Sequence, residues 1–323
     1  MPPGAKEYRI VASMGAVMVV TQALALLLAF PFKNAGFQAF EDPSDPINPI
    51  MYLAAILLFS GVILLIVKLG RKNIIRALIL FATWAVLVDV FLLGFAYLFY
   101  YWFGIEHIVD GFGLWELSFA FAALMASGFT YMLVVNPEWY VVNFVGILVG
   151  AGVASILGIS LWILPMLILL IALAIYDAIS VYKTKHMISL ADAVTEQHLP
   201  VLMVFPKDEG YSFKEQKGIK ADLDSGKERE AMFIGLGDIV IPGALVVSAF
   251  ANLPWDGAGF IGKPLVVAIG TIVGILVGFY FLMRYVLKGN PQAGLPLLNG
   301  GAIIGYAITY LLAYGDLTFG IVW

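Results

Sequence analysis

The chain contains no cysteine, only three histidines and few charged residues. In 323 residues, the absence of cysteine excludes disulfides, thiolate nucleophiles and cysteine metal sites. The histidines (His107, His186 and His198) lie outside the long apolar runs, so no imidazole is available inside a membrane for a serine-protease base or an HExxH zinc site. Charged residues make up 12% of the chain and hydrophobic residues 62%, against about 25% and 45–50% in soluble domains. This composition indicates a membrane protein, with carboxylate chemistry, transport or a structural role as its function.

The charge balance is weakly acidic. Twenty-two acidic and eighteen basic residues give a formal net charge of -4, which argues against nucleic acid as a partner because nothing would neutralise its phosphates. With no cysteine and no intramembrane histidine, we expect neither a metal ion nor another cofactor. The expected surroundings are the lipid bilayer of a cell membrane or of an internal membrane, with the protein inserted as an integral multi-pass protein.

Nine apolar runs are each about long enough to cross a bilayer, which takes roughly 20 residues because backbone polar groups in lipid must be satisfied within the segment. We therefore predict an all-α polytopic membrane protein with nine transmembrane helices. Their approximate limits are 10–30, 49–67, 75–102, 114–135, 139–156, 162–181, 233–250, 262–286 and 295–313.

Basic residues are distributed unequally between the two sides of this topology. With a cytoplasmic N-terminus, 16 of the 18 basic residues fall on the inner side, and only Lys33 and Lys263 fall outside. Cytoplasmic loops carry such an excess of lysine and arginine. The sequence therefore predicts a cytoplasmic N-terminus and a C-terminus on the outer side.

The predicted helices are interrupted by one long polar segment. Residues 207–230 carry 13 charges in 24 positions, which indicates a flexible loop. We divide the chain into helices one to six (1–182), a partly disordered cytoplasmic loop (183–232) and helices seven to nine (233–323). Within the loop, the segment 199–205 (LPVLMVF) has the composition of a strand.

Four carboxylates lie within the apolar runs, where an ionised aspartate costs roughly 2.5–3.5 kcal/mol on insertion scales and is a functional candidate by default. Glu116 lies close to a helix end, and Asp89 has no carboxylate at matching depth. Asp177 lies about 9 Å, and Asp238 about 12 Å, from the cytoplasmic ends of consecutive antiparallel helices at 1.5 Å per residue. These two side chains are expected to meet.

Two carboxylates at close range in a low-dielectric site share one proton. The ionised member then activates a water while the protonated member donates to a scissile carbonyl, which is the chemistry of aspartic proteases. A structural hydrogen bond could use the same pair, and a proton-coupled transporter or cation leak channel could use Asp89, Asp177 and Asp238 as a proton relay. Gly235 and Gly237 precede Asp238 and would let a peptide backbone approach it, although glycines also serve helix packing.

The motifs Tyr176-Asp177 and Gly235-Leu236-Gly237-Asp238 on consecutive helices, followed by Ala293-Gly294-Leu295-Pro296 before the last one, resemble the presenilin and signal-peptide-peptidase family of GxGD intramembrane aspartyl proteases. The third motif departs from the family's Pro-Ala-Leu at its first two positions. The predicted orientation is similar to that of the presenilin-like branch.

The resemblance implies an aspartic endopeptidase that cleaves transmembrane helices of other membrane proteins. It assigns catalysis to Asp177 and Asp238. It also implies that substrate contacts come from Tyr176, Gly235, Leu236, Gly237, Gly294, Leu295 and Pro296. The strand-prone segment 199–205 is a candidate for pairing with an unwound substrate. Whether the protein forms a homo-oligomer is left open by the sequence.

Overall fold

The computed structural model describes residues 5–103, 113–184, 200–208, 210–215, 230–255, 262–288 and 292–321. Within these residues, each of the nine predicted apolar runs contains an α-helix, and a two-stranded sheet lies between the sixth and seventh of them. The helices are α1 (Ala5–Asn34), α2 (Asn48–Lys68), α3 (Lys72–Phe103), α4 (Leu114–Val135), α5 (Trp139–Ser160), α6 (Ile163–Ile179), α9 (Leu236–Asn252), α10 (Lys263–Val286) and α11 (Leu295–Tyr314).

Seven of these helices are long and apolar enough to cross a membrane, while the apolar parts of α2 (Asn48–Ile63) and α9 (Leu236–Asn252) are shorter. The expected start of the seventh helix was wrong. The run predicted as a helix from position 233 begins as strand β2 (Ala231–Gly235), and α9 starts only at Leu236. A short apolar run has no periodicity that separates strand from helix, which explains the error.

The strand predicted at 199–205 is present as β1 (Leu202–Pro206), which pairs antiparallel with β2. The predicted cytoplasmic loop is therefore partly ordered as a sheet, and its boundary at 232 falls inside β2. Most of the segment predicted to be flexible, 207–230, lies outside the described residues, which omit 209 and 216–229. Because β2 leads directly into α9, the sheet fixes where that helix begins.

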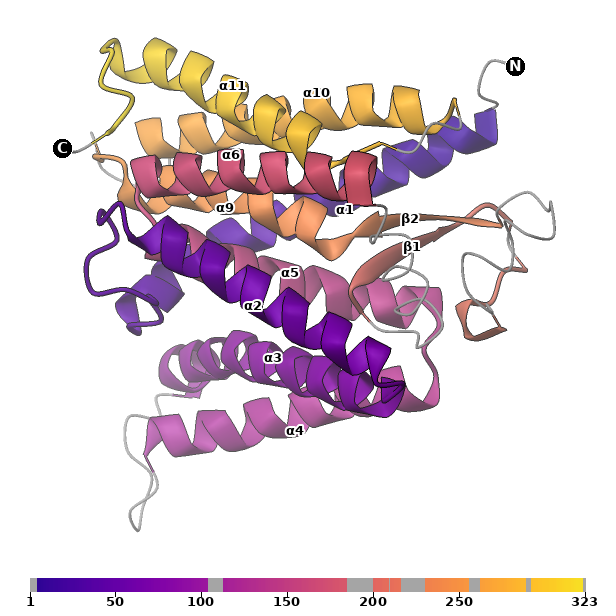
Figure 1. The fold of residues 1–323 in the computed structure, drawn as a ribbon. Coiled ribbons are helices and arrows are strands. Elements are labelled where there is room, and N and C mark those ends of the chain that lie inside the picture. The colour runs from indigo at the N-terminus through magenta and orange to yellow at the C-terminus, as the bar shows by residue number, and fades with distance from the viewer. Residues whose placement is uncertain are drawn as a thin grey trace.

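The helices form a bundle with α5 and α9 at its centre (Figure 1). Helix α5 packs against α1 and α9; α3 and α4 pack together on one side of the centre, and α10 and α11 on the other. All residues of α9 are buried except Gly237, Asp238 and Ile241. The most central helix is therefore open to its surroundings only around its aspartate.

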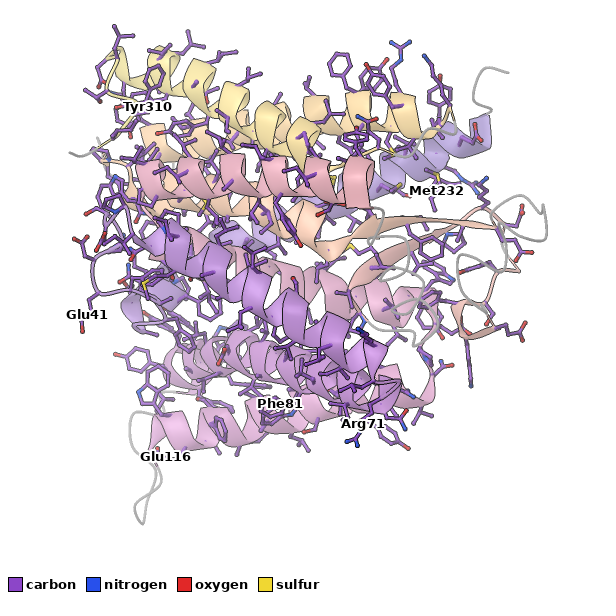
Figure 2. All side chains as sticks on the ribbon, viewed as in Figure 1. Glu41, Arg71, Phe81, Glu116, Met232 and Tyr310 are labelled. Carbon is purple, nitrogen blue, oxygen red and sulfur yellow. The ribbon has the colours of Figure 1, made fainter. Side chains whose placement is uncertain are left out.

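The two ends of the bundle differ in what they carry. Helix α1 begins at the end where β1 and β2 lie, and α11 ends at the opposite one (Figure 1). Figure 2 shows Met232 of β2 and Arg71 at the first end, and Glu41, Glu116 and Tyr310 at the second. The sheet end is thus the end that the charge distribution predicts to be cytoplasmic.

Two close approaches set the positions of the sheet and of α11. The side-chain amide of Asn143 on α5 donates to the Val204 carbonyl and accepts from the Val204 N–H, both at 2.7 Å, as a neighbouring strand would. On the other side of the bundle, a Cβ at Gly274 of α10 would overlap the Gly301 carbonyl oxygen of α11. The backbones of α10 and α11 therefore touch, which fixes where α11 begins.

Candidate active site

Asp177 lies two residues before the end of α6 and is only 4% exposed. Its Oδ2 accepts a hydrogen bond of 3.0 Å from the N–H of Leu295, the first residue of α11, and its carboxylate also accepts from the N–H of Gly294. The first N–H groups of a helix have no partner within the helix. The carboxylate of Asp177 therefore caps the N-terminus of α11.

Asp238 lies in the first turn of α9 and is partly exposed. Its carboxylate accepts a hydrogen bond from the N–H of Gly235, the residue that caps α9. Four residues further on, Pro242 has no N–H, so the backbone carbonyl of Asp238 lacks its usual helical donor. Asp238 thus occupies the N-terminus of a second helix, at the point where strand β2 becomes α9.

The two aspartates meet at Gly294. A Cβ built on Gly294 would lie 3.1 Å from Oδ1 of Asp238, while Asp177 binds the N–H of the adjacent Leu295. The two carboxylates are also near enough to interact electrostatically. The depth argument from the sequence therefore predicted a real proximity, and the glycine at position 294 leaves room for the Asp238 carboxylate beside the start of α11.

The charges around the pair favour one negative charge and oppose two. Each carboxylate lies at a helix N-terminus, where the backbone N–H groups and the helix dipole stabilise an anion. Two carboxylates at close range in a low-dielectric site repel each other when both are ionised. A pair holding a single shared proton satisfies both conditions, and it supplies one acid and one base at the same place.

The remaining predicted site residues divide into those at the pair and those elsewhere. A Cβ on Gly235 would lie 3.2 Å from Oδ2 of Asp238, whereas Gly237 is exposed and has no atom within 4 Å of such a Cβ among the described residues. Tyr176 is 39% exposed on the surface of α6. Leu236 is buried, and its Cδ1 packs against Gly150 of α5, so it anchors the start of α9 instead of facing an open cleft.

A groove of about 300 Å³ separates α6 from α11 directly beside the pair. It includes Ala178, the residue after Asp177, and Pro296, the residue after Leu295. The sequence did not single out its one polar residue, Asn299; a lone asparagine in an apolar run was the available signal. The lining residues are Leu170, Ile171, Ala174, Ile175, Ala178, Pro296, Asn299, Gly300 and Ile303.

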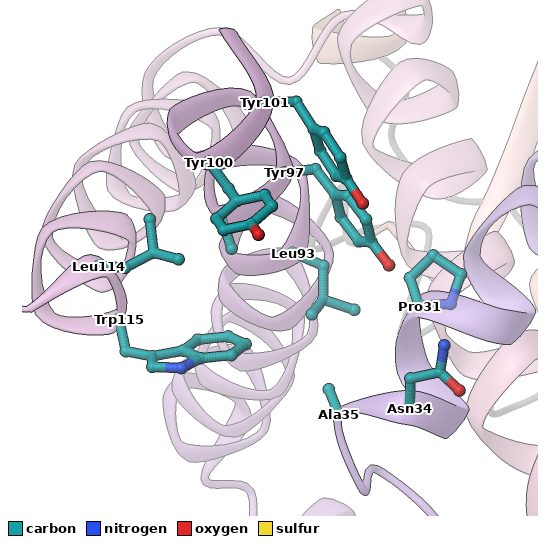
Figure 3. Close-up of a pocket in the computed structure, with 10 residues that line it drawn as sticks. Pro31, Asn34, Ala35, Leu93, Tyr97, Tyr100, Tyr101, Leu114 and Trp115 are labelled. Carbon is teal, nitrogen blue, oxygen red and sulfur yellow. The ribbon is translucent and has the colours of Figure 1, made fainter. Parts of the chain in front are cut away.

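A second pocket, of about 220 Å³, lies between the ends of α1 and α3 and the start of α4. Figure 3 shows Tyr97 and Tyr101 with their hydroxyls directed toward Pro31 and Asn34. These residues lie at the end of the bundle opposite β1 and β2. None of the predicted site residues lines this pocket, so it is separate from the aspartate pair.

The structure does not bring the other intramembrane carboxylates to the pair. Asp89 is on α3, which packs mainly against α4 and α5, and Glu116 is in the first turn of α4. A relay from Asp89 to the pair would have to cross another helix, such as α2 or α5, because within the described residues α3 has no extensive contact with α6 or α9. Among the described residues, no group of three or more histidine, aspartate or glutamate side chains is arranged to hold a metal ion.

Comparisons with known proteins agree with this geometry. The family described as signal-peptide peptidase, presenilin aspartyl protease matches residues 15–315. Two solved structures are similar, both of a presenilin family intramembrane aspartate protease. One, in the C222 space group, has 32% identity and a TM-score of 0.62 over 94% of this chain and 98% of that chain. The other, in the P2 space group, has 34% identity and a TM-score of 0.64 over 93% and 97%. The comparison with curated proteins gives no match.

These matches cover nearly the whole chain and favour an aspartic endopeptidase over a transporter or leak channel. They also agree with the apolar helices in indicating an integral membrane protein whose substrates are transmembrane proteins. The chain belongs to the signal-peptide peptidase and presenilin family of intramembrane aspartyl proteases.

Proposed function

We propose that Asp177 and Asp238 are the catalytic pair of this protease. The observation that carries the assignment is that both carboxylates meet at the Gly294–Leu295 peptide, one through a hydrogen bond and the other through close contact. The residues of α9 that are not buried, Gly237, Asp238 and Ile241, lie at the same place. A substrate peptide would reach the pair from this open side.

The pair would hydrolyse a peptide bond with one shared proton. The ionised carboxylate takes a proton from a water molecule, whose oxygen bonds to the scissile carbonyl carbon, while the protonated carboxyl donates its proton to the carbonyl oxygen. The resulting gem-diol then collapses: one hydroxyl proton returns to a carboxylate, the other carboxyl protonates the leaving nitrogen, and the C–N bond breaks. The pair ends with one proton, as it began.

The presenilin-like topology, with nine spanning helices and a cytoplasmic N-terminus, forms part of the proposal. It is supported by the excess of basic residues predicted on the side where β1, β2 and the start of α1 lie. Because Asp177 is near the end of α6 and Asp238 near the start of α9, cleavage would occur close to this face. Homo-oligomerisation stays an open prediction.

An unwound substrate would bind by pairing with the sheet as an additional strand. The strand with which it would pair is β2, not β1. β1 lies between β2 and α5, where Asn143 occupies both polar groups of Val204. Within the described residues β2 is paired on one side only. The predicted pairing of the substrate with segment 199–205 is therefore revised to pairing with the other strand of the same sheet.

The register of the sheet identifies which groups face this free edge. Leu236 donates to the Val201 carbonyl and Lys207 to the Glu230 carbonyl, so alternate residues between them bond across the pair. Phe233 falls on the non-bonded positions, and its N–H and carbonyl point away from β1. An extended peptide beside Phe233 would be led toward Asp238, five residues later.

Replacing either aspartate by asparagine tests the catalytic assignment. Asp177→Asn and Asp238→Asn should each lower cleavage of a single-span substrate peptide by at least about a thousandfold, because an amide is nearly isosteric but cannot share the proton. The measurement is the mass analysis of fragments released by the purified protein. Thermal unfolding midpoints close to the wild-type value provide the control, and substantial cleavage by either folded variant would refute the pair.

Position 294 tests the role of the contact between α11 and Asp238. Gly294→Ala places a methyl about as near to the carboxylate as packing allows, and we expect a loss of a few-fold in kcat. Gly294→Val adds two further methyls and should displace the carboxylate, with a loss of more than about a hundredfold. Gly128→Val on α4, where a Cβ would meet no atom of the described residues within 4 Å, is the control for a valine in a spanning helix. Equal activity of both Gly294 variants would contradict the geometry.

The free edge of β2 is tested by comparing two substitutions of Phe233. Phe233→Ala removes the ring, which packs near Phe213, and keeps the N–H; Phe233→Pro removes both. Since proline at an edge position leaves the ladder to β1 intact, the proline variant should have a kcat/KM about tenfold below that of the alanine variant, mainly through a higher KM. If the two variants cleave equally well, substrate does not pair with this N–H.

A further inference from the structure

Asn299 is a buried polar residue in the wall of the groove between α6 and α11. It is 1% exposed and lies on α11, one turn after Leu295. Its Nδ2 donates a hydrogen bond of 2.9 Å to the backbone carbonyl of Leu170 on α6. Half of the amide therefore holds the two helices together.

The carbonyl oxygen of the same amide is buried without a hydrogen bond to any described residue. Oδ1 of Asn299 has no hydrogen-bond partner among the described residues. Exchanging the amide oxygen and nitrogen would not help, because the oxygen would then face the Leu170 carbonyl. A buried carbonyl oxygen without a donor costs about 1–3 kcal/mol, and an apolar side chain would fill the same place without that cost.

The groove offers no other polar side chain. Among the described residues that line it, all but Asn299 are aliphatic, glycine or proline. Ile171 and Ile175 on its rim are 51% and 57% exposed, so the groove opens toward the lipid. At its inner end, Ala178 and Pro296 adjoin Asp177 and Leu295, which makes the groove continuous with the proposed catalytic pair.

We propose that Asn299 is a substrate-binding residue: Oδ1 accepts a hydrogen bond from a backbone N–H of the substrate segment that lies unwound in this groove. The occupant is the substrate's own transmembrane segment, because its unwound N–H groups lack acceptors in an apolar environment. Oδ1 is covered by the groove walls, which have to separate slightly as the segment enters. The inference rests on the proposed catalytic role of Asp177 and Asp238.

Helix geometry predicts which N–H is bound. Asn299 lies four residues beyond Leu295, about 6 Å along α11 on the side away from β1 and β2. An extended peptide advances about 3.3 Å per residue. The N–H in question is therefore about two residues from the scissile bond, on the side of the substrate away from the sheet end of the bundle.

A backbone ester scan of the substrate tests this assignment. An ester in place of one amide removes a single N–H and no side chain. The full-length protein is assayed with a single-span peptide and with variants carrying an ester one, two, three or six residues from the cut. Each substrate is tested on the wild type, on Asn299→Leu and on Ile303→Ala, which changes an apolar residue of the same groove.

We expect the ester two residues from the cut to lower the wild-type kcat/KM about tenfold relative to the amide, the size of a typical net hydrogen bond. The ratio of kcat/KM for the amide substrate to kcat/KM for this ester substrate should fall to about one in Asn299→Leu and stay near ten in Ile303→Ala. If Asn299 only holds α11 to α6 through its hydrogen bond to Leu170, Asn299→Leu should lose the same factor of activity on the amide and on the ester substrate. The amide-to-ester ratio would then equal that of the wild type, and this result would overturn the proposal.

If Asn299→Leu does not fold, the wild-type scan decides alone. A drop confined to the position two residues from the cut, or to its immediate neighbour, supports the assignment, and an equal response at all four positions overturns it. Failure of the catalytic proposal is recognised separately, because Asp177→Asn would then still cleave the all-amide peptide.

Discussion

A carboxylate inside a bilayer needs compensation, and in this protein the N-termini of two helices supply it. Asp177 accepts hydrogen bonds at the start of α11, and Asp238 accepts one at the start of α9. Helix N-termini carry unpaired N–H groups and the positive end of the dipole. The two helix N-termini can therefore stabilise one negative charge at this point, while repulsion between the two carboxylates disfavours a second.

The rest of the fold keeps those two helix starts together. The close backbone contact at Gly274 and Gly301 fixes α11 against α10, and Asn143 fixes β1 against α5. Through its pairing with β1, strand β2 then determines that α9 begins at Leu236 and not earlier. Gly294 completes the arrangement, because any side chain there would compete with the Asp238 carboxylate for space.

Much of this could be predicted from the sequence, and the limits have physical causes. The apolar runs predicted the helices because lipid demands long apolar segments, and counting residues to the helix ends predicted that Asp177 and Asp238 meet. Strand β2 was missed because the apolar run starting at Phe233 does not distinguish strand from helix. The hydrogen bond between Asp177 and Leu295 joins residues 118 positions apart, and no local pattern reports such a contact. Asn299 was missed because its significance depends on an unpaired atom that only packing reveals.

The most direct test of the central claim is the pH dependence of binding of a hydroxyl-bearing peptide isostere, whose tetrahedral carbon resembles the gem-diol. If Asp177 and Asp238 act as one unit with a single shared proton, the affinity of the wild type should be bell-shaped in pH, because it falls when the pair gains a second proton or loses its only one. Either single asparagine variant should lose this profile together with most of the affinity. A wild-type affinity that does not change with pH, or asparagine variants that bind as tightly as the wild type, would contradict the account.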